Sequence, residues 1–249
     1  LYAAYANGFK SGGFNGEVIN NATHFQDEGL FDAETVDAFE IGFKKSGTNF
    51  SVNAAGFFQA YDAPQARIFV PFTTADGGSF SSNSLSNLDK ATSYGAEIDA
   101  SWTPLDGLDL FAGVTLLKTE IDQTEDPAVP QNAESFDGND LPFASEISGV
   151  LSAKYGWDLT DRVAASVEAN GKYQSSFFLD AEGRDDRKQA GYEIVDGSAT
   201  LHVDYKVDVG IWARTLTNAD YAVSGFGFIG YNTFCGAPRS YGVALKYSY

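Results

Sequence analysis

The 249-residue chain has no apolar run near the roughly 20 residues that a membrane-spanning helix needs. It has one cysteine, Cys235, so no disulfide can form within the chain, and such thiol scarcity fits a bacterial envelope protein. Only 16 Lys and Arg stand against 34 Asp and Glu, giving a net charge of −18. Because phosphate binding needs a basic surface, no nucleic-acid partner is expected.

Aromatic residues and glycine are abundant instead. Aromatics make up 14% of the chain, with 13 Tyr and 20 Phe, and there are 26 Gly. Both enrichments favour strands and turns over helices. The mean hydropathy of −0.21 suits an ordinary globular protein. Since the alternating strands of a membrane barrel also average to a modest hydropathy, composition leaves both classes open.

The last nine residues alternate without exception. The apolar set is Tyr241, Val243, Leu245, Tyr247 and Tyr249, separated by Gly242, Ala244, Lys246 and Ser248. Successive side chains of a strand point to opposite faces, so one face here is apolar and the other small or polar. The same period predicts about ten strands along the chain, clearest at 93–102, 147–158, 163–174 and 207–214.

The predicted connections alternate in length. Four are short, at 45–48, 104–107, 159–161 and 205–206, and five are long, at roughly 11–34, 63–90, 122–145, 180–191 and 219–238. A soluble sandwich mixes its loop lengths. Tight periplasmic turns alternating with long extracellular loops are typical of an outer-membrane barrel. The sequence therefore predicts an all-β, transmembrane, antiparallel up-and-down β-barrel.

The two faces of the predicted strands support this fold. Charged residues share one face, which would be the lumen: Glu97, Asp99, Glu168, Lys172, Asp208 and Arg214. The other face carries rings beside the short turns, as in an interfacial girdle: Trp102, Tyr155, Trp157, Tyr247 and Tyr249. A soluble β-sandwich is the weaker alternative, because two packed sheets have no reason to gather their rings at one end.

Five stretches together resemble the barrel of TonB-dependent receptors. They are "YANGFKSGGFNG" (5–16), "ETVDAFEIGFK" (34–44), "ATSYGAEIDASWTPLDGLDLFAGV" (91–114), "RTLTNADYA" (214–222) and "GAPRSYGVALKYSY" (236–249). The resemblance implies a barrel of about 22 strands closed by an N-terminal plug, with residues 1–249 forming its C-terminal part. We expect the plug, its TonB box and the earlier strands to precede residue 1, since the chain opens inside a predicted strand without an initiator Met.

The resemblance also implies active transport across the outer membrane of a Gram-negative bacterium. A scarce ligand, typically a ferric siderophore or another metal chelate, would bind the extracellular loops, and the TonB complex would act through the plug. The C-terminal strand, with Tyr241, Val243, Leu245, Tyr247 and Tyr249 on its apolar face, resembles the signal read by the barrel-assembly machinery. Outer-membrane lipid and lipopolysaccharide are the other implied partners, and no cofactor is expected.

Two alternatives within the barrel class stay open. One is a passive porin-type channel. The other is a small self-closing barrel of about ten strands, an enzyme or adhesin. In the second, the strand at 1–10 would pair with the strand at 239–249.

The sequence predicts no enzyme and no metal site. His24 lies in a long loop, and His202 lies close to the short turn at 205–206, away from the extracellular rim where a barrel protease would need an Asp/His pair. No serine stands out beside a histidine and an acid, and no residues have metal-ligand spacing. The acidic loop at 122–145 is expected to be solvated, although it could hold Ca²⁺ or bridge lipopolysaccharide through divalent ions.

Aromatic and amide side chains in the long loops are the candidate ligand-binding residues. They are Phe14, Asn15, Phe69, Phe72, Tyr221, Phe226, Phe228 and Tyr231. Exposed rings could stack on a planar or apolar ligand, or equally pack on neighbouring loops. Anionic ferric chelates would favour basic loop residues, which are few: Arg67, Arg184, Arg187 and Lys188.

Overall fold

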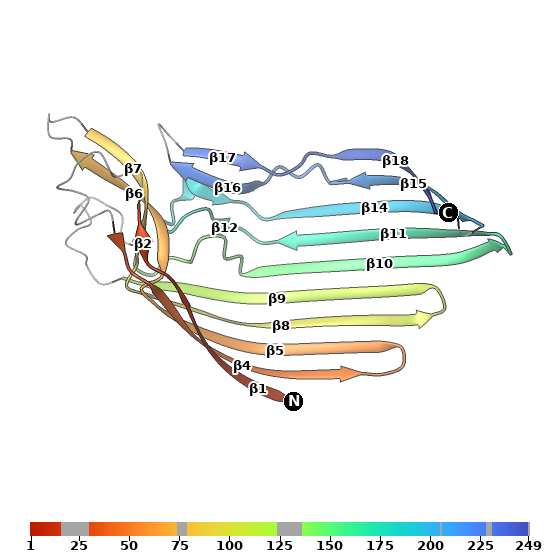
Figure 1. The fold of residues 1–249 in the computed structure, drawn as a ribbon, viewed down its shortest axis with the longest axis horizontal. Coiled ribbons are helices and arrows are strands. Elements are labelled where there is room, and N and C mark those ends of the chain that lie inside the picture. Colours follow the sequence, from red (N-terminus) through yellow and green to blue (C-terminus); the bar gives the residue numbers. More distant parts are fainter. Residues whose placement is uncertain (16–29, 74–78, 124–135, 205, 228–230, 249) are drawn as a thin grey trace.

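Ten strands form one antiparallel sheet in the computed structural model, which describes residues 1–15, 30–73, 79–123, 136–204, 206–227 and 231–248 (Figure 1). In spatial order they are β1 (Tyr2–Lys10), β4 (Glu34–Ser46), β5 (Phe50–Asp62), β8 (Lys90–Leu105), β9 (Leu108–Asp122), β10 (Ile147–Thr160), β11 (Val163–Gln174), β14 (Tyr192–Val203), β15 (Val207–Arg214) and β18 (Ser240–Tyr247). Spatial order equals chain order, which confirms the predicted up-and-down arrangement.

The connections confirm the predicted alternation of lengths. Figure 1 shows the turns β4–β5, β8–β9, β10–β11 and β14–β15 at one end of the sheet and the small elements of the long connections at the other. These small elements are the strand pairs β2 (Gly13–Phe14) with β3 (Leu30–Phe31), β6 (Gln65–Thr73) with β7 (Ser79–Asn87), β12 (Phe177–Phe178) with β13 (Lys188–Gln189) and β16 (Ala222–Gly227) with β17 (Tyr231–Cys235), and the short helix η2 (Asp185–Arg187). Within the described ranges, no helix has the length and apolar content needed to span a membrane.

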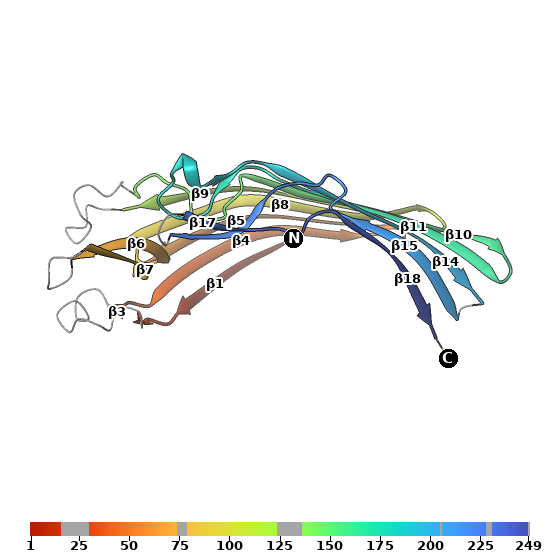
Figure 2. The same cartoon turned by 90° about the horizontal axis from the view of Figure 1, so that it is seen from above.

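The strand register gathers polar side chains on one face of the sheet. Rows of directly paired residues run across several strands, such as Lys44–Asn53–Asp99, Lys154–Glu168–Ser198 and His202–Asp208–Lys246. Along β4 from Glu34 to Gly42 the residues of this face are less exposed than their neighbours on the other face. That difference is expected for the concave side of a curved sheet, and Figure 2 shows the curvature.

The opposite face is apolar and bounded by aromatic rows at both ends. The predicted row beside the short turns is present and includes Trp102, 52% exposed, together with the stacked rings of Tyr155 and Trp157. A second row, not predicted from the sequence, is formed by the register partners Tyr5, Phe39, Phe58 and Tyr94. From Tyr94 to Trp102 the strand covers about 26 Å at roughly 3.3 Å per residue, close to the height of about 25 Å expected for a lipid-facing band.

The short turns depend on local backbone chemistry. Gly107, between β8 and β9, has a φ of +83°, a conformation that glycine adopts without steric cost. A Cβ at this position would also collide with the carbonyl oxygen of Gly156 on β10. Asp204, between β14 and β15, accepts a hydrogen bond of 2.8 Å from Arg162 Nη2 in the neighbouring turn. The turns are therefore packed against one another as well as closed individually.

A small hydrophobic core holds the long connections against the sheet. Ile121, at the end of β9, is completely buried, and its neighbours come from three different connections. The cluster contains Ala66, Leu88, Ile121, Phe136 and Ala181, with Leu141 packed against it. Burial of these side chains fixes the described parts of the connections relative to the strands.

The two edge strands decide among the predicted architectures. Among the residues that the structure describes, β1 pairs only with β4 and β18 only with β15, so the two strands lie at opposite edges of the sheet (Figures 1 and 2). The self-closing ten-strand barrel is therefore wrong, because it requires these strands to pair. The soluble sandwich is also wrong, because all ten long strands belong to a single sheet.

Candidate functional site

A cavity of about 310 Å³ lies among the long connections. Its walls come from the β5–β8, β9–β10, β11–β14 and β15–β18 connections, which meet beside the hydrophobic core. The polar and charged lining residues are Gln65, Arg67, Asp180, Glu182, Arg187, Ser224 and Tyr231, and the apolar ones include Leu85, Leu88, Leu141, Phe143 and Leu179. A concave, mostly apolar site with a few converging polar groups is typical of ligand recognition.

Arg187 is the central charged residue of this cavity. Its side chain is 13% exposed, and its Nη1 lies 2.9 Å from Asp180 Oδ2 and 2.6 Å from Glu182 Oε2. The guanidinium also lies 4.8 Å from the centroid of the Tyr231 ring. Two carboxylates and an aromatic face therefore satisfy a positive charge that would be costly to bury alone.

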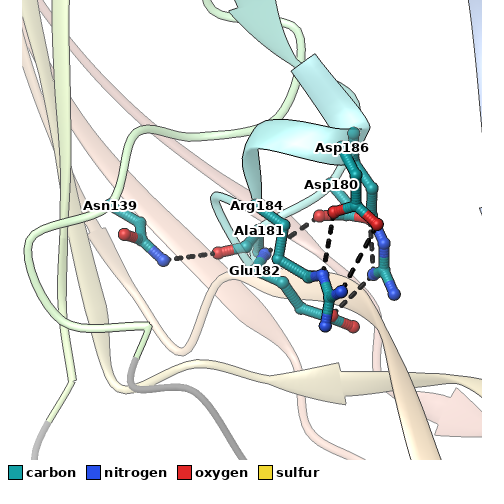
Figure 3. A network of polar contacts seen from close by, with 7 residues as sticks. Asn139, Asp180, Ala181, Glu182, Arg184 and Asp186 are labelled. Atoms are coloured by element: carbon teal, nitrogen blue, oxygen red, sulfur yellow. Dashed lines mark hydrogen bonds and ion pairs between the residues drawn. The ribbon is translucent and has the colours of Figure 1, made fainter.

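The segment that carries these charges is braced by a second set of contacts (Figure 3). Asn139 Nδ2 donates a hydrogen bond of 3.0 Å to the carbonyl oxygen of Ala181. Arg184 Nε donates to Asp186 Oδ1 at 3.0 Å, and this guanidinium lowers the pKa of the Asp186 carboxyl. The β9–β10 and β11–β14 connections are thereby joined directly, which holds Asp180 and Glu182 in place.

Tyr231 presents a buried phenol to the same cavity. Burial, with a smaller contribution from the Asp180 carboxylate, raises the pKa of Tyr231 to about 12. Its hydroxyl lies near the Asp180 carboxylate but forms no well-aligned hydrogen bond with the described residues. The ring lies against the backbone of Gly225 on β16, where a Cβ would collide with it. The Gly- and aromatic-rich sequence of this connection thus lets rings pack closely on the backbone.

The other predicted ligand-binding residues occupy varied positions. Tyr221 stacks on Tyr192 with ring centroids 4.5 Å apart. Phe14 is 65% exposed on β2, whereas the Asn15 amide both donates to and accepts from the backbone of Leu85. Phe69 pairs with Asn83, Phe72 with Phe80 and Phe226 with Asn232 through the backbone, and their side chains, like all of Phe228, lie outside the described residues. Of the four candidates whose side chains the structure describes, Phe14, Asn15, Tyr221 and Tyr231, only Tyr231 lines the cavity.

Sequence reasoning missed the residues that build this site. Gln65, Asp180 and Glu182 were not predicted to have a role, and Arg187 was considered only as a possible anion contact. The stretch "DAEGRDDR" (180–187) contains opposite charges close together. That alternation is the one signal that could have indicated a neutralised arginine.

The structure also brings together a serine, a histidine and an acid that the sequence did not reveal. Ser166 Oγ lies 3.0 Å from His202 Nε2, and His202 Nδ1 lies 2.8 Å from Asp208 Oδ1, across β11, β14 and β15. Nucleophilic catalysis also needs donors for the developing oxyanion. The backbone around Ser166 is paired on both sides within the sheet, so its N–H groups cannot serve. The row is better explained as a polar bridge across the concave face.

The family comparison matches this fold. The family model described as "TonB dependent receptor-like, beta-barrel" matches residues 1–228. The chain belongs to this family. As a TonB-dependent receptor chain, it is located in the outer membrane of a Gram-negative bacterium.

Individual TonB-dependent receptors share the fold at low sequence identity. The pesticin receptor of Yersinia pestis is 22% identical over 238 residues, which are 91% of this chain and 30% of the relative. The ferric yersiniabactin uptake receptor FyuA of Yersinia pestis superposes with a TM-score of 0.75 at 19% identity, covering 98% of this chain and 34% of its own. The siderophore receptor PiuA of Acinetobacter baumannii superposes with a TM-score of 0.72 at 18% identity. The superposition covers 99% of this chain and 33% of the PiuA chain. The chain thus spans about a third of the length of these relatives.

Proposed function

We propose that this chain forms the C-terminal part of the barrel of a TonB-dependent transporter that takes up a ferric siderophore or another metal chelate. The complete receptor would contain about 22 strands and a plug, and the TonB complex would supply energy through that plug. Ligand capture would occur at the long extracellular connections. Transport would follow from rearrangement of the plug, without covalent chemistry.

The observation that carries this proposal is the family match over residues 1–228. Two structural features support it: the sheet has one polar and one apolar face, and a mostly apolar cavity with few polar groups lies among four long connections at one end. The names of the ferric yersiniabactin uptake receptor and of the siderophore receptor PiuA point to ferric-chelate ligands. Tyr231 is the best-placed of the proposed ligand contacts, and the remaining ring candidates are proposed as outer contacts.

The C-terminal strand is proposed as the signal for the barrel-assembly machinery. Tyr241, Val243, Leu245 and Tyr247 lie on one face of β18 and are 80, 74, 75 and 63% exposed, whereas Tyr249 lies outside the described residues. An edge strand with one apolar face offers both backbone groups and side chains to a partner. Lipid and lipopolysaccharide would surround the same face after assembly.

Uptake of radioactive iron in the native host tests the proposed function. Wild-type cells, cells lacking the full-length receptor gene and cells lacking TonB would be compared under iron restriction with a panel of ferric chelates. We expect uptake of at least one chelate to require both the receptor and TonB. Uptake that requires the receptor but not TonB would indicate a passive channel, and unchanged uptake of every chelate without the receptor would contradict the proposal.

A further inference from the structure

Three buried polar atoms without a hydrogen-bond partner converge on the cavity among the long connections. They are Gln65 Oε1, Arg187 Nε and Tyr231 Oη, and within the described part of the chain no other buried side-chain nitrogen or oxygen lacks a partner. All three residues line the cavity. Buried polar groups are normally satisfied, so three exceptions at one cavity point to an absent binding partner.

The surrounding contacts fix which of these atoms donate and which accept. Gln65 Nε2 donates to the carbonyl oxygens of Ser11 and Asp32 at 3.0 and 2.9 Å. Both partners are acceptors, so the remaining amide atom of Gln65 must be an acceptor oxygen. Arg187 Nε–H is a donor, and the Tyr231 hydroxyl can act as either. The cavity therefore offers one acceptor, one donor and one group of either kind.

The charge of the cavity disfavours an anionic ligand. Its lining contains two basic residues, Arg67 and Arg187, and two acidic residues, Asp180 and Glu182, so the charges balance. Arg187 is already paired with both carboxylates. Arg67 is the remaining basic lining residue, and the lining has no net positive charge, so a polyanionic group would gain little to offset its lost hydration.

We propose that this cavity binds an uncharged, amide-like arm of the transported chelate. The carbonyl oxygen of an amide in the arm would accept from Arg187 Nε–H or the Tyr231 hydroxyl, and its N–H group would donate to Gln65 Oε1. A volume of about 310 Å³ suits one arm rather than a whole chelate. The inference rests on the proposed function and narrows the substrate class to hydroxamate- or amide-bearing chelates rather than polyanionic catecholates.

Tyr231→Phe in the full-length receptor separates ligand binding from structure. The hydroxyl forms no well-aligned hydrogen bond with the described residues, so we expect its removal to leave the empty receptor folded. We expect the affinity for ferric desferrioxamine B, a trihydroxamate with amide groups, to fall about two- to tenfold, as for one lost hydrogen bond. Tyr61→Phe is the matched control, because the Tyr61 hydroxyl donates to Gln59 and does not line the cavity. We expect this control to bind like the wild type.

A second variant tests the electrostatic part of the inference. Glu182→Gln removes one of the two carboxylates beside Arg187 and leaves the cavity with a net positive charge. Binding of a trianionic ferric tris(catecholate) should then increase by roughly threefold at physiological ionic strength. Equal catecholate binding by the wild type and this variant would contradict the role of charge balance.

The outcomes distinguish this inference from the proposed function. Preference for the trihydroxamate, weakened by Tyr231→Phe and not by Tyr61→Phe, would support it. Preference for the tris(catecholate), or trihydroxamate binding insensitive to Tyr231→Phe, would overturn the inference and leave the transport function standing. Failure of the wild-type receptor to bind or take up any ferric chelate would overturn both.

Discussion

Tyr231 combines a buried hydroxyl, a cation–π contact and a cavity wall in one side chain, and these features make its protonation measurable. The phenol has a pKa of about 12, against an ordinary value of 10.0. Between these pH values an unfolded chain loses the phenol proton while the folded chain keeps it. Folding stability should therefore be fully retained below about pH 10 and fall as the pH rises toward 12.

Thermal unfolding of the full-length receptor between pH 9 and 12 checks this expectation about Tyr231. Tyr231→Phe cannot titrate, so its melting temperature should fall less than that of the wild type across this range. The difference should be absent below pH 10 and largest at pH 12. Parallel curves for the two proteins would show that the hydroxyl is not held in a poorly solvated site.

At the residue scale, the sequence indicated which residue types could have a role but did not indicate which residues contact one another. Tyr231 was identified because aromatic residues in long loops are conspicuous. The roles of Gln65 and Glu182 depend on partners brought together by folding, such as Ser11 for Gln65 and Arg187 for Glu182. Ser166 and His202 lie 36 residues apart in the chain and meet only through strand register. Periodicity assigns a face to each residue, but without register it cannot give neighbours across strands.

At the element scale, β18 allows a direct test of which face meets lipid. Val243 lies on the apolar face and is 74% exposed, whereas the adjacent Ala244 lies on the polar face. Val243→Arg should destabilise the assembled barrel by about 2–4 kcal/mol, because an arginine would enter the middle of the lipid-facing band. Heat-modifiable mobility of the full-length receptor on gels measures assembly.

Ala244→Arg is the control for this test of β18. The same side chain is introduced one residue away but projects toward the polar face, so assembly should be close to wild type. Equal loss in the two variants would contradict the assignment of faces.

The β8–β9 turn provides a second test at this scale. Gly107→Ala combines the strain of a positive φ with a collision against the Gly156 carbonyl, whereas Gly138→Ala has a similar φ of +78° and open space around its Cβ. Gly138→Ala should cost about 1 kcal/mol of stability, the strain alone. Gly107→Ala should cost about 1–3 kcal/mol more. Urea unfolding of the assembled receptor would measure both, and equal costs would contradict the close packing of adjacent turns.

The elements themselves were largely predictable. Alternation marked β8, β10, β11, β15 and β18 because one face is apolar and the other is polar, and short turns bounded them within a few residues. The second aromatic row, at the end of the sheet near the long connections, was not predicted, and the reason is physical. Tyr5, Phe39, Phe58 and Tyr94 form a row only once the register of four strands is known. Small pairs such as β12–β13 were missed because two-residue strands carry no periodic signal.

For the whole molecule, the two unpaired edges determine whether residues 1–249 can stand alone. β1 and β18 each have one neighbour, so each presents a row of unsatisfied backbone groups along the band that faces lipid. Such groups cost several kcal/mol each in hydrocarbon. We expect residues 1–249, expressed alone, not to insert as a monomer, whereas the full-length receptor does. A heat-modifiable, protease-resistant monomer formed by residues 1–249 in lipid would contradict this expectation.

The agreement between chain order and spatial order has a consequence for how such sheets change over evolution. Each long strand pairs only with the long strands before and after it in the sequence, so the unit that can be gained or lost is one hairpin with its short turn. Duplicating or deleting such a unit widens or narrows the sheet by two strands without threading any other segment. Meanwhile the long connections can diverge without changing the strand pairing, although contacts such as Asn139 with Ala181 couple a change in one connection to its neighbour. The ten-stranded sheet can therefore keep its alternation of polar and apolar residues while the side chains of the long connections change.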